Sequence, residues 1–138
     1  MITLIVGKKG TGKTKKLIQL VNDAVKTSSG NVVCIEKGAK LTYDIDHKAR
    51  LVDIEQYSVS GFDALFGFLS GICAGNYDVT DIFVDSTLKI TGDDLEQLAA
   101  FVQKLNTLAQ LSETKITLSV SADRQDLPES INDIAQEI

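Results

Sequence analysis

A glycine-rich segment near the start of this 138-residue chain constrains its fold more than any other feature. The segment consists of Gly7, Lys8, Lys9, Gly10, Thr11, Gly12, Lys13 and Thr14. Residues 2–6, just before it, form a short apolar run rich in β-branched side chains, which is typical of a buried strand. After it, apolar residues recur at helical spacing, so we expect a helix over residues 13–26. A strand, a glycine-rich turn and a helix therefore follow one another directly.

The spacing Gly-x-x-x-x-Gly-Lys-Thr is that of a phosphate-binding loop, or P-loop. Gly7, Gly10 and Gly12 allow backbone angles and close approaches that a Cβ atom would block, so backbone N–H groups can surround a phosphate. Lys13 would place a positive charge on the β- and γ-phosphates of a nucleotide, and the Thr14 hydroxyl is a suitable Mg²⁺ ligand. The segment predicts nucleotide binding.

The remaining chain alternates between predicted strands and helices, which indicates a single domain over residues 1–138. Strands are expected at residues 31–35, 81–85 and 115–121, and helices at residues 61–75 and 95–109. A final short helix is expected to start at Asp126, with Pro128 in its first turn. This alternation predicts an α/β fold, a three-layer α/β/α sandwich with a mostly parallel sheet.

Three local features are predicted from less regular sequence patterns. Residues 41–45 and 49–54 are predicted to form a hairpin that turns at residues 46–47. Thr91 with Asp94 resembles a capping box before the helix that starts near residue 95. The helix over residues 61–75 contains a row of glycines, for which we expect close packing against a neighbouring element.

Composition narrows the classes of function. A net charge of −5 argues against broad nucleic-acid binding. Five of the fourteen basic residues nevertheless lie between residues 8 and 16, where they would attract phosphates. No apolar run approaches the ~20 residues of a membrane span, and no signal peptide is visible, so we expect a cytoplasmic protein. Cys34 and Cys73 lie in apolar runs and are expected to be buried free thiols, whereas His47 should face solvent.

The apolar run over residues 81–85 ends in an acid, which is the Walker B pattern. Because ligands of parallel sheets bind at the carboxyl ends of the strands, Asp85 is predicted to hold Mg²⁺ together with Thr14, through water. Glu36 follows the preceding predicted strand and is expected at the same edge.

The order of these features resembles the RecA-like core of recombinase and circadian-clock ATPases, over roughly residues 1–121. In that group the strand after the P-loop helix ends in a glutamate that activates water, and a later strand ends in Val-Asp-Ser. Residues 32–36 and 82–86 match both features. The resemblance implies that Glu36 is the catalytic base, because Ser86 occupies the place after Asp85 where other P-loop proteins carry a glutamate. Asp53 and Glu55 are the next choices. The alternative is that Glu36 only caps a strand or pairs with Lys37 or Lys40 on the surface.

The chain also departs from that resemblance. Members of the group carry further hairpins that supply DNA-binding loops or a neighbour's positive finger, and this sequence stops before them. Ser121 lies where the group often has a residue that senses the γ-phosphate. Arg124 would supply a positive charge in cis or in trans, or would lie on the surface beside acidic residues. A homo-oligomer would be another source of such a trans charge.

Two functions follow from these residues. The first is a Mg²⁺-dependent ATPase with slow intrinsic hydrolysis, since the missing positive finger is worth roughly 10³–10⁵ in rate in related systems. The second is a regulatory or binding module that binds ATP with little or no turnover. A small phosphotransferase ranks lower because no arginine-rich lid follows the core. ATP is favoured over GTP because the guanine-reading Asn/Thr-Lys-x-Asp motif is absent.

Overall fold

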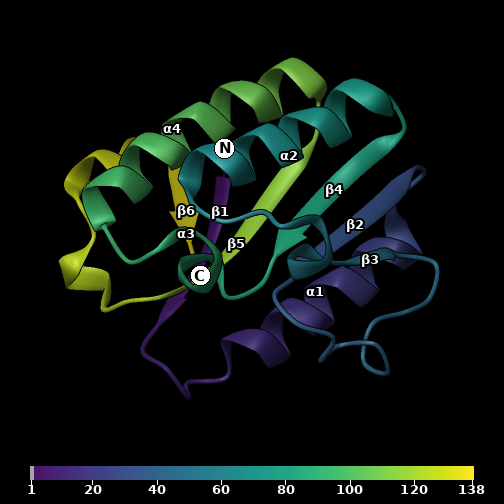
Figure 1. Cartoon of the computed structure of the whole chain (residues 1–138), viewed down its shortest axis with the longest axis horizontal. Coiled ribbons are helices and arrows are strands. Elements are labelled where there is room, and N and C mark those ends of the chain that lie inside the picture. The colour runs from purple at the N-terminus through teal and green to yellow at the C-terminus, as the bar shows by residue number, and fades with distance from the viewer. Residues whose placement is uncertain (1) are drawn as a thin grey trace.

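The computed structural model of the chain describes residues 2–138, which form three layers with a sheet in the middle (Figure 1). The six strands have the order β3-β2-β4-β5-β1-β6, and each neighbouring pair is parallel. They are β1 (Ile2–Gly7), β2 (Asn31–Glu36), β3 (Arg50–Asp53), β4 (Val79–Val84), β5 (Lys115–Ser121) and β6 (Ala135–Glu137). The predicted α/β class is confirmed, and the sheet is parallel throughout.

Helices connect these strands on both faces of the sheet. They are α1 (Lys13–Thr27), η1 (Ile54–Tyr57), α2 (Phe62–Gly75), α3 (Thr87–Thr91), α4 (Leu95–Ser112), η2 (Arg124–Asp126) and η3 (Glu129–Asp133), where η marks a 3₁₀ helix. The three long helices were predicted nearly to the residue, whereas the short α3 was not predicted. No helix within residues 2–138 is long and apolar enough to cross a membrane.

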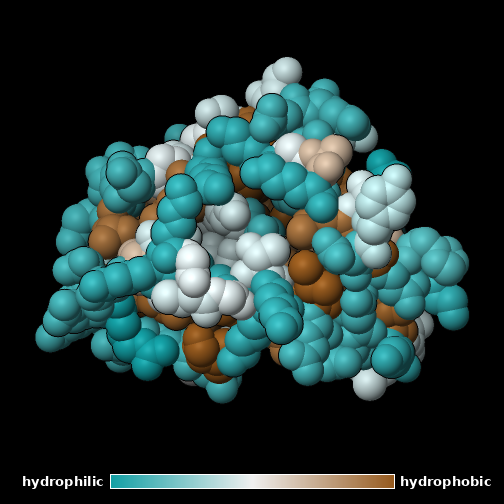
Figure 2. All heavy atoms as spheres, turned by 90° about the horizontal axis from the view of Figure 1, so that it is seen from below, coloured by the Kyte–Doolittle hydropathy of each residue, from teal (hydrophilic) through white to brown (hydrophobic). Residues whose placement is uncertain are grey.

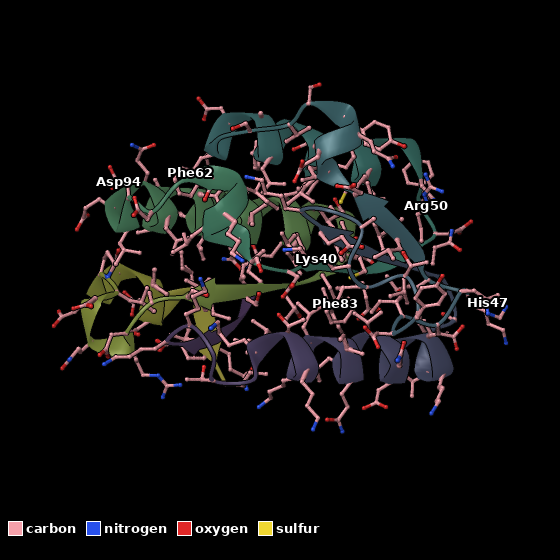
Figure 3. The ribbon with its side chains drawn as sticks, turned by 60° about the horizontal axis from the view of Figure 1, so that its bottom comes forward. Lys40, His47, Arg50, Phe62, Phe83 and Asp94 are labelled. Carbon is pink, nitrogen blue, oxygen red and sulfur yellow. The ribbon has the colours of Figure 1, made fainter. Side chains whose placement is uncertain are left out.

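Each face of the sheet has its own apolar core. Helix α1 packs on one face, where Leu17 and Val21 meet Cys34 and Phe83 of the sheet, and Phe83 lies between the sheet and α1 in Figure 3. Helices α2 and α4 lie side by side on the other face (Figure 1). Strand β2 is buried from Val32 to Glu36 because both of its faces are covered, which explains its continuous apolar run.

Both cysteines are buried free thiols, as predicted. Burial, together with the nearby carboxylates of Asp85 and Glu36, raises the pKa of the Cys34 thiol to about 12. His47 is exposed and projects from the edge of the molecule (Figure 3), also as predicted.

The predicted hairpin over residues 41–54 is wrong. Residues 41–45 form turns instead of a strand, with the backbone N–H groups of Asp44 and Ile45 donating to Leu41 O at 3.0 and 3.1 Å. Leu41, Ile45 and Ala49 are buried in the core beside α1, so their spacing of four anchors a loop rather than a pleated strand. Only Arg50–Asp53 is a strand, and it pairs with β2 in parallel.

The end of the chain also differs from the prediction. Pro128 precedes the 3₁₀ helix η3 as its N-cap and does not occupy its first turn. The chain then continues into β6, which was not predicted and which extends the sheet beside β1. Ile138 N donates to Leu4 O at 2.9 Å, so pairing with β1 continues to the last residue.

Two further local predictions are wrong. Asp94 is itself the N-cap of α4: its Oδ1 accepts from Glu96 N at 3.0 Å and from Gln97 N at 3.1 Å, while Thr91 ends α3. The glycines of α2 are not packing contacts either. A Cβ atom at Gly67, Gly71 or Gly75 would meet nothing within 4 Å, because this face of α2 is exposed.

Candidate phosphate-binding site

The P-loop joins β1 to α1 at the carboxyl edge of the sheet. Because β5 lies between β1 and β4, the ends of these three strands meet there. A cavity of about 320 Å³ opens at this point, and its walls come from the P-loop, from the turn after β4 and from β5. It is lined by Lys9, Gly10, Gly12, Lys13, Thr14, Ser86, Lys89, Ser119 and Ser121. Figure 2 shows a hollow bordered by residues of intermediate hydropathy, the class of glycine, serine and threonine, within a hydrophilic surface.

Glycine is needed at the three glycine positions of the P-loop for different structural reasons. Gly10 and Gly12 have φ angles of 84° and 86°, in the left-handed region that strains residues with a Cβ atom. Gly7 has no such angle, but a Cβ atom there would lie 2.5 Å from Thr11 Oγ1. A glycine-rich loop this tight can present backbone N–H groups to an anion.

The Lys13 ammonium group currently bonds to its own loop. Its Nζ donates to Lys8 O at 2.9 Å, and the Thr11 hydroxyl donates to the same carbonyl at 2.7 Å. Burial lowers the pKa of Lys13, the charge of Asp85 opposes this effect, and the positive charge of Lys89 lowers the pKa again. A phosphate in the cavity would have to attract the Lys13 ammonium away from Lys8 O.

Thr14 and Asp85 lie in contact, although 71 positions separate them in the sequence. The Thr14 hydroxyl is 3.1 Å from Asp85 Oδ1 and 3.2 Å from Oδ2. A hydroxyl and a carboxylate are oxygen ligands of the kind that Mg²⁺ prefers, so these residues fit that ion.

A second hydroxyl, from β5, fixes the Asp85 carboxylate. Ser119 is almost fully buried, and its Oγ donates to Asp85 Oδ1 at 2.8 Å. The same Oγ accepts from Ser86 N at 2.7 Å. Ser86 has a φ angle of 52°, which is uncommon for a residue other than glycine, and the bond from its amide to Ser119 helps to hold it there.

Glu36 is buried with only 3% of its surface exposed, at the end of β2 next to β4. Its Oε1 accepts from Lys40 N at 2.9 Å and from Leu41 N at 3.1 Å, so the carboxylate caps the loop that follows β2. Lys40 lies near the centre of the view in Figure 3. Burial raises the pKa of Glu36, these backbone N–H donors oppose the effect, and the charges of Asp53 and Asp85 raise the pKa further. Glu36 is not among the residues that line the P-loop cavity.

The other acids and bases considered from the sequence have local partners. Asp53 accepts from Gly38 N at 2.9 Å and caps η1 through Glu55 N at 3.1 Å. Arg124 Nε lies 2.9 Å from Glu137 Oε1, which ties the segment after β5 to β6. Lys8 Nζ lies 3.5 Å from Asp123, so Lys8 faces the segment after β5.

Sequence reasoning missed two residues of the cavity, Ser119 and Lys89. The signal for Ser119 was present, since a serine two positions before Ser121 in a strand shares its face. Recognising its role required the sheet order, which places β5 beside Asp85. Lys89 lies in α3, four residues after Asp85, and no motif indicated it.

Comparisons with known proteins agree with this geometry at the level of the fold. No protein-family model and no curated protein matches the chain. Among solved structures, the chain is similar to the flagellar accessory protein FlaH from Methanocaldococcus jannaschii, with a TM-score of 0.56 and 16% sequence identity. The match covers 96% of this chain and 65% of that one, so this chain spans just under two thirds of the FlaH chain.

The parallel sheet, the P-loop between β1 and α1, and this match define the class. The chain has the RecA-like P-loop fold, as the resemblance implied. At 16% identity, the likeness to FlaH concerns the fold alone.

Proposed function

We propose that this protein binds ATP together with Mg²⁺ in the P-loop cavity and hydrolyses it slowly. The contact between the Thr14 hydroxyl and both carboxylate oxygens of Asp85 is the observation that carries the proposal. It joins a P-loop side chain to an acid at the end of β4, beside a cavity that three lysines line. Oxygen ligands next to a positively charged, glycine-lined cavity suit a metal ion and a chain of phosphates.

The roles of the residues follow from their positions. Thr14 and Asp85 would hold the metal, which supplies neutralisation of the phosphate charge when bound. Ser119 would keep Asp85 oriented. The P-loop amides and Lys13 would bind the phosphates, with Lys13 exchanging its bond to Lys8 O for one to a phosphate oxygen.

For hydrolysis, we assign Glu36 as the group that orients and deprotonates water. Its raised pKa makes it a better proton acceptor than an ordinary carboxylate. Two backbone N–H donors fix Oε1, while Oε2 has only a long contact of 3.4 Å with Leu41 N. Turnover is expected to be slow without a positive finger from another copy or partner.

A second candidate function is ATP binding without turnover, as in a regulatory module. Two observations favour it: Glu36 does not line the cavity and serves as a loop cap, and Ser86 follows Asp85 where a carboxylate would serve as a base. The two candidates share the same binding site and differ only in the fate of the nucleotide.

The binding proposal is tested by calorimetry with Mg²⁺ and ATP, and GTP serves as a competitor. We expect wild-type protein to bind, Lys13→Ala to lose at least about tenfold in affinity, and Asp85→Asn to lose its Mg²⁺ dependence. Lys26→Ala, an exposed lysine at the far end of α1, is the charge control and should bind like wild type. Equal binding by wild type and Lys13→Ala would refute the assignment.

Turnover is tested by phosphate release from wild type, Glu36→Gln and Lys13→Ala. Glutamine retains the acceptor oxygen for Lys40 N and Leu41 N but is a much weaker base, so Glu36→Gln should bind ATP and release no phosphate. Equal rates in wild type and Glu36→Gln would exclude Glu36 as the base. Binding with no release above the Lys13→Ala background would establish the second candidate.

A further inference from the structure

Lys89 brings a positive charge to the P-loop cavity from outside the P-loop. It lies in α3, and its side chain lines the cavity together with Lys9 and Lys13. Its backbone N–H donates to Ser86 O at 3.0 Å, so the turn that carries Lys89 begins directly after Asp85. The cavity therefore receives lysines from two segments of the fold.

The backbone below Lys89 is fixed on several sides. Thr87 and Ile90 are buried, and Ile90 O accepts from Gly61 N at 2.9 Å. The Lys37 ammonium group donates to Lys89 O at 3.0 Å. The Lys89 side chain is exposed above this fixed backbone, so its stem can extend over the cavity without any movement of α3.

Lys89 has no carboxylate partner within residues 2–138. The ion pairs there, with N···O separations of up to 4.0 Å, involve Lys8, His47, Lys104 and Arg124. Lys9, Lys13 and Lys89 line one cavity of about 320 Å³, and a ligand with several negative charges would relieve the repulsion between their ammonium groups.

The position of Lys89 indicates which part of the ligand it would meet. Lys13 and the P-loop glycines line one wall of the cavity, whereas Lys89 and Ser86 line the wall formed by the segment directly after Asp85. Thr14 and Asp85 would hold Mg²⁺, which would neutralise phosphate charge when bound. A cation that follows Asp85 so closely in the chain is therefore placed for the terminal phosphate.

We propose that Lys89 is a specificity-determining cation, supplied within the same chain, that contacts the γ-phosphate and makes the site prefer a nucleoside triphosphate over a diphosphate. This inference rests on the proposed function. It assigns to α3 the positive charge that was predicted to come from Arg124 or from a second copy of the chain.

The test is calorimetry with Mg²⁺, comparing ADP with a non-hydrolysable ATP analogue. Wild type should bind the triphosphate analogue more tightly than ADP. Lys89→Met keeps the apolar stem and removes the charge, so it should lose about tenfold or more for the analogue and less than about threefold for ADP. Lys89→Arg should recover most of the preference. Lys26→Met, at an exposed lysine near the far end of α1 that does not line the cavity, should leave both affinities unchanged.

The outcomes separate this inference from the proposed function. Retained ADP binding by Lys89→Met shows that the variant is folded and that the site is intact. Equal losses for ADP and the analogue, or no loss for either, would overturn the role of Lys89 while nucleotide binding stands. Failure of wild-type protein to bind either nucleotide would instead refute the proposed function, and the inference with it.

Discussion

Three hydroxyl groups surround the carboxylate of Asp85, and each comes from a different element. Thr14 reaches it from the start of α1, Ser119 from β5, and Ser86 from the turn after β4, where its Oγ lies 3.4 Å from Oδ2. Ser119 has the most constrained position because it is buried and makes two hydrogen bonds at once. We therefore regard Ser119 as a positioning residue for Asp85, the acid proposed to hold the metal.

Ser119→Ala should raise the Mg²⁺ concentration needed for half-maximal nucleotide binding by about 10–100-fold. This is the usual loss of metal affinity when a group that orients a metal ligand is removed. It should also lower the free energy of unfolding by about 1–3 kcal/mol, because Ser86 N loses its acceptor. Magnesium titrations at fixed nucleotide concentration give the first quantity, and urea unfolding gives the second.

Thr114→Ala is the matched control for this substitution. Thr114 is buried next to the opposite end of β5, and its hydroxyl donates to Val79 O at 3.1 Å. It should lose similar stability with no change in Mg²⁺ dependence. If both variants shift the Mg²⁺ titration equally, Ser119 acts only through stability.

At the scale of the residue, the sequence predicted those parts of the site that lie in a contiguous motif. Residues 7–14 and Asp85 were predicted because their types and spacing suit phosphate and metal chemistry, and the structure brings Thr14 and Asp85 into contact. Ser119 and Lys89 were missed because their roles depend on which strand lies beside which. The helical glycines were misinterpreted, since a spacing of four cannot distinguish a packed face from an exposed one.

At the scale of the element, the chain was predicted well where a strand or helix has a long periodic pattern. Helix α4 and strand β5 are examples, because each buries a regular set of side chains. The loop over residues 37–49 and strand β6 were not predicted. In the loop, Asn22 of α1 donates to Asp44 O at 3.0 Å and accepts from Asp46 N at 2.8 Å. Such tertiary contacts produce no periodic pattern in the sequence. Strand β6 has only three residues, which is too short for such a pattern to be recognised.

Replacing glycine by alanine should have opposite effects on the free energy of unfolding in a turn and in an exposed helix. A Cβ atom at Gly30, in the turn from α1 to β2, would overlap the backbone oxygen of Asp78. Gly30→Ala should therefore lower the free energy of unfolding by about 1–3 kcal/mol. Gly67→Ala, on the open face of α2, should raise it by about 0.5–1 kcal/mol because alanine favours the helix.

Urea unfolding of the two variants under identical conditions measures both effects, with an unchanged m-value as the sign of an unchanged fold. A stabilised Gly30→Ala would show that the turn relaxes freely. A destabilised Gly67→Ala would show that the outer face of α2 is covered in solution.

At the scale of the whole molecule, the cavity is built from segments distant in sequence that meet only in the folded chain. A ligand that needs β1, β4 and β5 together binds the folded state alone, so it stabilises the entire sheet. The five lysines over residues 8–16 would attract the phosphates of such a ligand locally in spite of the net charge of −5.

Mg²⁺ with ATP at about 100 times the dissociation constant should therefore raise the free energy of unfolding by about 2.7 kcal/mol and the Tm by several degrees. Thermal unfolding followed by circular dichroism provides the measurement. The shift should grow with the logarithm of the nucleotide concentration and vanish in Lys13→Ala. A concentration-independent Tm in wild-type protein would contradict a nucleotide site made by the folded sheet.

The position of β1 in the sheet determines when, during synthesis, the P-loop gains its neighbouring strands. Strand β1 is synthesised before the other five strands of the sheet, yet its two neighbours are β5 and β6, the last two of the six in sequence order. Strands β2, β3 and β4 are consecutive in the sequence and can pair while the ribosome is still at work. The P-loop, in contrast, has no supporting strand until residues 115–121 have emerged. Nucleotide added to ribosome-bound chains should therefore protect them from proteolysis only after residues 115–121 have left the ribosome.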